Sequence, residues 1–441
     1  MTIRRRELLL AGAAAAAAAP AVSSAQPAAD HAARASIVEL LREVVGDAQR
    51  PLTGASVAWL YGNGQVSRAW VGWREVAALH PEGSLPIEAE THFRVASVSK
   101  LLLALAMLRL HDDRLLDLDT DLAPLLQGAL RHPRHPSVPV TPRLILTHRS
   151  GLLDNVVLPL ADGEALRRAL ADPVHWGAEP PGLFFRYSNF ACVVLATAME
   201  LAARQPFDAL MQRWLFDPLG LRARYAPTSL PREQRAQLST LYRRPNGSAR
   251  WIPQMDAPGD LGPVVTPQAL KAVGENASVH SPHGGLRVGV PDLARVTRLL
   301  MQQGRWDGRR LLSADSWAQL LRPHWTLSAQ SPGETAGGLF RSWALGMQHF
   351  TDTRDAQDGD RLPPRGRWRG FGHLGSAYGL LSGLLFGPAE GGRPPWGLVY
   401  VINGTSQAAT ETPGRYSSLR RCEERIVEGL LDTLKGALPD A

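Results

Sequence analysis

Segments with strand character lie near both ends of this 441-residue chain, and helix-like segments lie between them. Residues 55–61 and 65–71 are short apolar runs joined by a Gly-Asn-Gly turn at 62–64, which is typical of a β-hairpin. Residues 379–386 and 396–402 are apolar runs of strand length. These segments predict an α/β (α+β) fold in which one sheet is built from both termini and an all-helical region is inserted between them.

Helical periodicity predicts most of the remaining elements. Apolar residues at helical spacing predict helices over residues 35–48, 98–112, 191–203, 291–302, 313–321 and 417–434. Glycine and proline crowd residues 253–267, which predicts a long surface loop near the mouth of a cleft. We expect the sheet part to occupy about 35–95 and 275–435, and the helical part about 100–270, within one domain over 26–441.

Residues 1–25 have the composition of an export signal. Arginines at 4–6 precede an alanine-rich apolar stretch, and the small residues Ser23 and Ala25 suit cleavage before Gln26. The Arg-Arg-x-Leu-Leu run is typical of a twin-arginine signal, although an uncleaved membrane anchor is the alternative. We therefore expect an exported protein, periplasmic or extracellular, with no stable membrane span after cleavage.

Export would permit a disulfide between the two cysteines, Cys192 and Cys422. Each cysteine lies inside an apolar helical pattern, far from the other in sequence and without neighbours typical of a metal site. This setting favours two buried thiols over a disulfide.

Arginine supplies almost all of the positive charge. Of the 48 basic residues only three are lysines, Lys100, Lys271 and Lys435, and the formal net charge is +7. The arginines are scattered among acidic residues, so the charge does not indicate a nucleic-acid partner. A guanidinium cannot lose its proton near neutral pH, so a lysine in this chain marks a position where a titratable amine could be needed.

Ser97 and Lys100 are the first candidates for catalysis. They lie three positions apart where a loop enters the apolar helix predicted at 98–112, and residues at this spacing share one helix face. A serine becomes a nucleophile when a neighbouring base takes its proton, and a lysine whose pKa is lowered by burial can be that base. The alternative is an ordinary helix start, with Ser97 as its cap and Lys100 in solvent.

Tyr187 and Asn189 form a second candidate pair on a short loop before another apolar helix. A phenol can relay a proton, and an amide can hold a substrate carbonyl or a lysine. The alternative is a tyrosine that only packs at a helix entry.

His373 begins a His-Leu-Gly-Ser run just before the late strands, and His283 fits the same loose His-x-Gly pattern. We prefer His373 because it leads directly into a strand edge that could line a cleft.

The order of these motifs resembles that of a known superfamily. Phe93–Lys100, Leu146–Leu152 and Pro181–Asn189 are similar to the serine β-lactamase and penicillin-binding-protein superfamily, with His280–Leu286 and Trp343–Gly346 as further landmarks. The closest likeness is to the branch of class C β-lactamases, D-alanyl-D-alanine carboxypeptidases and related esterases. The resemblance covers roughly residues 35 to 435.

The resemblance implies a five-stranded antiparallel sheet flanked by helices, with the active site between the sheet and the helical region. It implies that Ser97 is the acylated nucleophile and that Lys100 is its general base. Tyr187 would share in proton transfer, and Asn189 would position Lys100 and the substrate. No cofactor or metal is implied.

The third motif of the superfamily corresponds to His373 and its neighbours. His373 stands where many relatives have lysine or histidine, and the backbone N–H groups of Ser97 and Ser376 would form an oxyanion hole. Leu374 departs from the family pattern, because relatives that act on β-lactams or peptide carboxylates usually carry threonine or serine there. Leucine cannot donate a hydrogen bond to a carboxylate, which disfavours efficient β-lactam hydrolysis.

Together the residues and the resemblance predict an exported serine hydrolase that acts on an ester, amide or D-amino-acid peptide. The alternative is a non-hydrolysing penicillin-binding or cell-wall-binding protein on the same fold. The expected partner is a small-molecule or peptide substrate, and the sequence predicts no oligomeric state. The chain has no Gly-x-Ser-x-Gly elbow and no His-Glu-x-x-His motif, which disfavours an α/β-hydrolase and a zinc protease.

Overall fold

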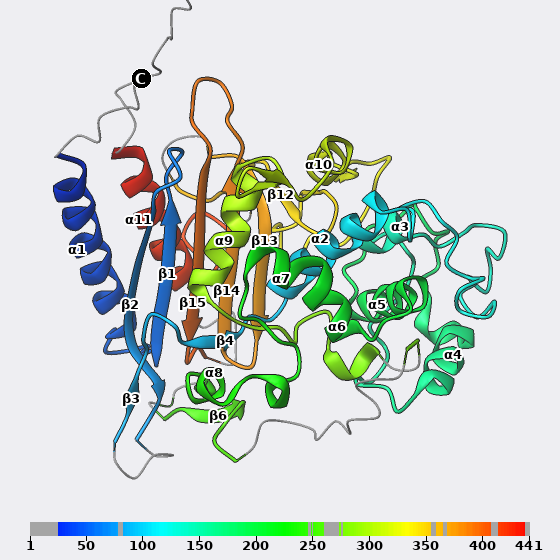
Figure 1. Ribbon diagram of the computed structural model, residues 1–441, viewed down its shortest axis with the longest axis horizontal. Helices are drawn as coiled ribbons and strands as arrows, with labels where there is room; N and C mark the ends of the chain where they lie inside the picture. Colours follow the sequence, from blue (N-terminus) through cyan, green and yellow to red (C-terminus); the bar gives the residue numbers. More distant parts are fainter. Residues whose placement is uncertain are drawn as a thin grey trace, which may run out of the picture.

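The computed structural model shows a large antiparallel sheet with helices on both faces and a helical region at one side (Figure 1). The structure describes residues 25–77, 83–245, 248, 250–259, 273–274, 277–353, 359–364, 368–406 and 413–436. The predicted export signal lies outside this range except for Ala25, and much of the predicted 253–267 loop also lies outside it. Among the described residues, no helix is both long enough and apolar enough to cross a membrane.

The main sheet has nine strands, so the predicted number of five is wrong. All its pairings are antiparallel, in the order β10 (Trp325–Thr326), β11 (Ser342–Trp343), β12 (Gln348–Phe350), β13 (Gly370–Ala377), β14 (Leu380–Gly387), β15 (Trp396–Asn403), β1 (Gly54–Leu60), β2 (Val66–Glu75) and β3 (Leu85–Pro86). Five of these strands have seven to ten residues. The other four have two or three residues, too few to show an alternating pattern in sequence.

The sheet joins the two ends of the chain, as predicted. β1 lies between β2, its hairpin partner, and β15, which comes from the C-terminal part. Every residue of β1 is buried because both of its faces are covered. Its side chains alternate between two hydrophobic cores: Val57 and Trp59 belong to one, and Ala58 and Leu60 to the other.

The outer core lies under two helices from opposite ends of the chain. α1 (Ala25–Val45) contacts β2 and α11 (Arg421–Gly436), and α11 also contacts β15. α1 begins ten residues before the predicted helix at 35–48. The prediction missed these residues because they are rich in alanine and carry little apolar periodicity. α11 begins at Arg421 and not at Ser417, because the carboxylate of Glu424 accepts the backbone N–H groups of residues 415–417.

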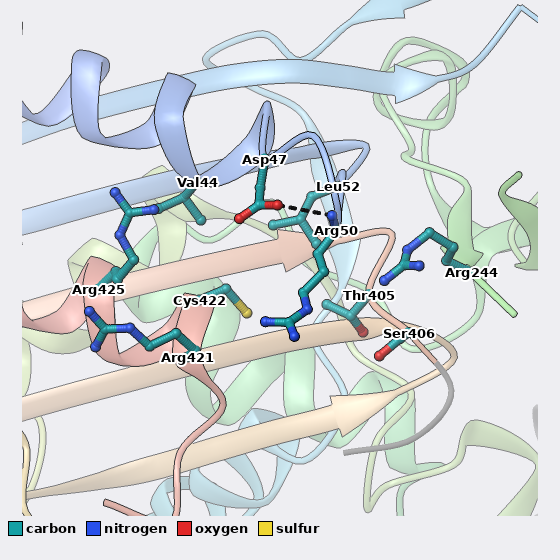
Figure 2. A pocket seen from close by; sticks show the side chains of 10 residues that line it. All are labelled: Val44, Asp47, Arg50, Leu52, Arg244, Thr405, Ser406, Arg421, Cys422 and Arg425. Atoms are coloured by element: carbon teal, nitrogen blue, oxygen red, sulfur yellow. Dashed lines mark hydrogen bonds between the residues drawn. The ribbon is translucent and has the colours of Figure 1, made fainter. Parts of the chain in front are cut away.

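A cavity opens near the ends of these two helices (Figure 2). Four arginines, Asp47, Cys422 and the hydroxyls of Thr405 and Ser406 are among the residues that line it. Two of its arginines form ion pairs with carboxylates of the helices, Arg421 with Glu424 and Arg425 with Glu43. The cavity contains none of the predicted site residues.

The inner face of the sheet carries α9 (Val290–Met301), which contacts β1, β14 and β15. Beside it lies the helical region, which contains α2 (Val98–Asp112), α3 (Pro142–Leu146), α4 (Gly163–Ala171), α5 (Asn189–Ala203), α6 (Phe207–Met211), α7 (Asp217–Leu219) and α8 (Arg232–Ala236). α10 (Ala314–Leu321) follows α9, and 3-10 turns lie at Pro173–His175, Pro227–Ser229 and Ala277–His280, with a π turn at Gln212–Phe216.

The inserted region is not all-helical as predicted, because β5 (Leu241–Arg243) pairs with β6 (Ile252–Met255) within it. Two further small sheets pair β4 (His92–Arg94) with β7 (Arg287–Gly289), and β8 (Arg305–Trp306) with β9 (Arg309–Arg310). The β4–β7 pair joins the segment just before Ser97 to the segment just after His283. This pairing brings two distant parts of the chain to the start of α2.

Candidate active site

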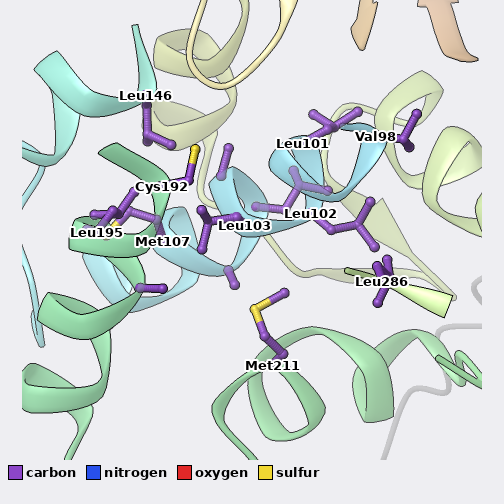
Figure 3. Packing of buried hydrophobic residues seen from close by; sticks show 14 of the residues in the cluster. Val98, Leu101, Leu102, Leu103, Met107, Leu146, Cys192, Leu195, Met211 and Leu286 are labelled. Atoms are coloured by element: carbon purple, nitrogen blue, oxygen red, sulfur yellow. The ribbon is translucent and has the colours of Figure 1, made fainter. Parts of the chain in front are cut away.

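The site is built at the start of α2, where the helix leaves the sheet and enters the apolar core. Its leucines pack against Leu195 of α5, Met211 of α6 and Leu286, among others (Figure 3). Ser97 occupies the N-cap position. Lys100 lies one turn further on and is only 2% exposed, although it is charged in water at neutral pH. A lysine buried this deeply needs polar partners.

Lys100 has three such partners. Its Nζ lies 2.9 Å from Ser97 Oγ, 2.7 Å from Asn189 Oδ1 and 2.8 Å from the backbone oxygen of His283. Burial lowers the pKa of Lys100 to about 8, and the nearby Cys192 and Asp154 act in the opposite direction. The amine is therefore held in place by two acceptors and directed at the serine, with its pKa close to neutral.

Tyr187 covers Lys100 from the side. The Lys100 Nζ lies 4.8 Å from the centre of the Tyr187 ring, which itself packs against His148 and Phe340 at ring-centre distances of 4.3 and 5.5 Å. Burial raises the pKa of Tyr187 well above its ordinary value, while a hydrogen bond with Ser97 lowers it. The phenol thus stays protonated near neutral pH and lies within reach of Ser97.

Asn189 begins α5 and links Lys100 to Asp154. The Asn189 Oδ1 accepts from Lys100, and the Asn189 Nδ2 donates to Asp154 Oδ2 at 2.8 Å. Ser188 is the N-cap of α5, and its hydroxyl accepts from the backbone N–H of Ala191. Helix α5 therefore presents its first residue to the lysine, as the motif predicts.

His373 lies on β13 with its ring against Trp343 and Tyr187, at ring-centre distances of 5.5 and 6.1 Å. Burial and the charge of Lys100 lower the pKa of His373 to about 3, so the ring is neutral. Its Nδ1 lies 2.6 Å from the backbone oxygen of Leu374, which places the ring proton on Nδ1. A neutral ring cannot supply the positive charge that a lysine would supply there.

Neighbouring residues of β13 face different ways. Leu374 packs against the outer core, on the opposite side of the strand from His373, because side chains alternate along a strand. The structure therefore does not bring the Leu374 side chain into the site, and the argument from its lost hydroxyl loses its basis. Ser376 is exposed, and only its backbone N–H is predicted to act.

Gly375 lets β13 lie very close to the backbone of Ser97. A Cβ atom at this position would be 3.1 Å from the Ser97 nitrogen, 2.7 Å from the Val95 oxygen and 2.3 Å from the Ser382 Oγ. The Ser97 N–H has no hydrogen-bond partner among the described residues. The close approach places the backbone at Gly375 beside the backbone nitrogen of Ser97.

Three residues in the site were not predicted to act there. Asp154 accepts from Asn189, and the backbone oxygen of His283 accepts from Lys100. His148 accepts the backbone N–H of Ser188 through its Nδ1 and packs its ring on Tyr187. The Leu146–Leu152 motif is a signal for His148. A backbone oxygen has no signature in sequence, so nothing pointed to the role of His283.

Within the described part of the chain, no cluster of three or more histidine, cysteine or acidic side chains could hold a metal ion. Both cysteines are free thiols. Burial raises the pKa of Cys192 to about 11, although Lys100 lowers it, so this thiol stays protonated beside the lysine.

Sequence comparison points to one family. The Beta-lactamase family model matches residues 37–419. Penicillin-binding protein 4 of Amycolatopsis lactamdurans is 26% identical over 316 residues, covering 71% of this chain and 73% of that protein. Esterase EstB of Burkholderia gladioli is 34% identical over 160 residues, covering 32% of this chain and 40% of the esterase.

Solved structures share the fold at low sequence identity. A Beta-lactamase/D-alanine carboxypeptidase from Yersinia pestis has a TM-score of 0.63 at 18% identity, covering 94% of this chain and 100% of that chain. EstCE1, a hydrolase with promiscuous acyltransferase activity, has a TM-score of 0.60 at 20% identity, covering 91% of this chain and 99% of that chain.

Proposed function

The chain belongs to the Beta-lactamase family, and on this basis we propose that it is an exported serine hydrolase that forms an acyl-enzyme at Ser97. The substrate is an ester, an amide or a D-amino-acid peptide. Relatives named as an esterase, a D-stereospecific amidohydrolase and a D-alanine carboxypeptidase support hydrolysis of this range of bonds.

The observation that carries the proposal is the set of three contacts around Lys100. Asn189 Oδ1 and the His283 oxygen have no proton to give, so two N–H bonds of the lysine must point at them. The remaining tetrahedral position points at Ser97 Oγ. In the neutral amine this position holds the lone pair, which is the orientation that a general base needs.

In the proposed reaction Ser97 is first acylated and then released by water. The Lys100 amine takes the proton of Ser97, and Oγ attacks the carbonyl carbon of the substrate. The charge on the carbonyl oxygen is stabilised by the backbone N–H groups of Ser97 and Ser376. The lysine proton passes to the leaving group, directly or through the Tyr187 phenol. Water then attacks the acyl carbon and gives a proton to the Lys100 amine. That proton passes to Oγ as the bond between Oγ and the acyl carbon breaks, which releases the acid and restores Ser97.

Intact mass spectrometry with a p-nitrophenyl ester and, separately, a penicillin tests this proposal. We expect an adduct with the wild type and none with Ser97→Ala, because Ser97 supplies the hydroxyl among the three oxygens that contact the Lys100 amine. Lys100→Ala should lower the acylation rate by about 100-fold or more. Matched controls are Ser328→Ala, in an exposed turn, and Lys435→Ala, on the exposed side of α11, which should behave like the wild type.

The outcomes separate the candidate functions. An equal adduct on Ser97→Ala would show that another residue is acylated and would overturn the mechanism. A penicillin adduct that forms on wild type and never clears, without release of product from the ester, would favour the non-hydrolysing penicillin-binding alternative. Ester turnover with neither a penicillin adduct nor hydrolysis of the penicillin would identify an esterase.

A further inference from the structure

Asp154 lies just after the Leu146–Leu152 motif and binds the start of α5 with both carboxylate oxygens. Its Oδ1 accepts from the Ser188 hydroxyl at 3.0 Å and from the backbone N–H groups of Asn189 and Phe190 at 2.7 and 2.9 Å. Its Oδ2 accepts from Asn189 Nδ2 at 2.8 Å and lies 2.9 Å from the Asn189 backbone nitrogen. The Oδ1 contacts belong to a helix cap, whereas the contact with Nδ2 does not.

The bond to Nδ2 decides which way the Asn189 carboxamide faces. A carboxylate can only accept hydrogen bonds, so it selects the amide nitrogen and leaves the amide oxygen to face Lys100. If the carboxamide turned over, its NH2 group would face the lysine and its oxygen would face the carboxylate. The contact with the carboxylate would then lose its hydrogen bond, because both groups are acceptors. Lys100 would lose one of the two acceptors that orient it, and the NH2 group could bond to the neutral amine only through the lone pair that is needed at Ser97.

We propose that Asp154 is a positioning residue for catalysis, which fixes the Asn189 carboxamide so that its oxygen holds the Lys100 amine in line with Ser97. This inference rests on the proposed function of Lys100 as the general base. It adds a residue that does not touch the reacting atoms, and it explains why one aspartate spans the cap of α5 and the catalytic asparagine.

The negative charge of Asp154 also raises the pKa of Lys100, because it favours the protonated lysine. The other titratable groups that face Lys100 are neutral near pH 7: burial keeps Tyr187 and Cys192 protonated, and it keeps His148, His283 and His373 unprotonated. The positive charge of Arg94 acts on His283, which lies between Arg94 and Lys100. Asp154 therefore supplies a negative charge that opposes the effect of desolvation on the pKa of Lys100.

The substitution Asp154→Asn separates positioning from capping. The Asn oxygen can keep the three contacts of Oδ1, but the new NH2 group faces Asn189 Nδ2, so two donors oppose each other. We expect kcat/KM for a p-nitrophenyl ester to fall roughly 10- to 100-fold. The midpoint of the acidic limb of the pH profile should move to lower pH, because Lys100 loses a favourable negative charge and an acceptor.

Asp162→Asn is the matched control. Asp162 is also an exposed aspartate and caps α4 by accepting the backbone N–H of Ala165 at 2.7 Å, but it contacts no site residue. We expect this variant to keep both the rate and the pH midpoint of the wild type. A double-mutant cycle adds a second test: Asp154→Asn should cause little further loss in an Asn189→Ala background if it acts through Asn189.

Several results would overturn the inference. One is an Asp154→Asn protein with the wild-type rate and pH midpoint. Another is a loss of kcat/KM on adding Asp154→Asn to Asn189→Ala that equals the loss it causes in the wild type. If Asp154→Asn does not fold, Asp154→Glu replaces it. This variant keeps the negative charge but displaces it, so the rate should fall while the midpoint of the pH profile stays the same. A wild-type rate in Asp154→Glu would contradict the positioning role of Asp154. Failure of the proposed function itself is distinct, because Ser97→Ala would then still be acylated.

Discussion

At the scale of the residue, Lys100 combines a lowered pKa with fixed geometry. The amine is the reactive form, and with a pKa of about 8 roughly one molecule in ten carries it at pH 7. We therefore expect kcat/KM to rise about tenfold per pH unit below pH 8 and to level off above it. Stopped-flow or plate measurements of p-nitrophenyl ester hydrolysis from pH 5.5 to 10 would show this limb.

Lys100→Arg is the informative variant for this limb. A guanidinium stays protonated over the whole range, so the rate should fall by about 100-fold or more and the limb should disappear. A profile with the same midpoint in Lys100→Arg would assign the titration to another group. Burial holds the pKa of His283 and His373 at about 3, which separates them from the expected midpoint.

At the scale of the element, the fit of β13 against the start of α2 depends on Gly375. We expect Gly375→Ala to reduce the acylation rate by about 100-fold, because the methyl group would push the strand away from the Ser97 backbone. Overpacking should also lower the free energy of unfolding by about 1–3 kcal/mol. Intact mass against time measures the rate, and thermal melting measures the stability.

Gly372→Ala on the same strand is the control for Gly375→Ala. A Cβ atom there would meet the Leu384 oxygen at 2.1 Å and would not approach Ser97. We expect a comparable loss of stability but, in the folded protein, an acylation rate close to that of the wild type. Equal rate losses in both variants would show that general distortion of β13, and not its approach to Ser97, is responsible.

At the scale of the whole molecule, the sheet separates two hydrophobic cores, of which only the inner one adjoins the predicted site. The predicted site residues lie on the inner side, with α2 and α5, whereas α1 and α11 cover the outer core. Leu41 of α1 is fully buried in the outer core, so Leu41→Ala should lower the free energy of unfolding by about 2–5 kcal/mol. Its kcat/KM below the melting transition should stay within about twofold of the wild type.

Urea unfolding and ester hydrolysis at 15 °C would measure these two quantities on one preparation. Leu102→Ala is the matched substitution in the inner core, next to the helix turn that carries Lys100. We expect it to lower both stability and rate. A large loss of kcat/KM in folded Leu41→Ala would show that the outer core also holds the site in shape.

The amino-acid sequence by itself determined the local features of this protein. The helix at 98–112 matches α2, the hairpin at 55–71 matches β1 and β2, and Ser97 and Lys100 share a helix face, because each depends on spacing within a few turns. The family was also evident, since the order of several short motifs is more specific than any one of them.

Only the tertiary structure decided which groups complete the site. Lys100 meets Asn189 and the His283 oxygen across 89 and 183 residues of chain, and periodicity has no information at that range. A backbone oxygen looks the same beside every residue, and Asp154 gains its role from where α5 begins. The short strands and the outward direction of Leu374 follow from pairing with neighbours, which a residue pattern of two or three positions cannot specify.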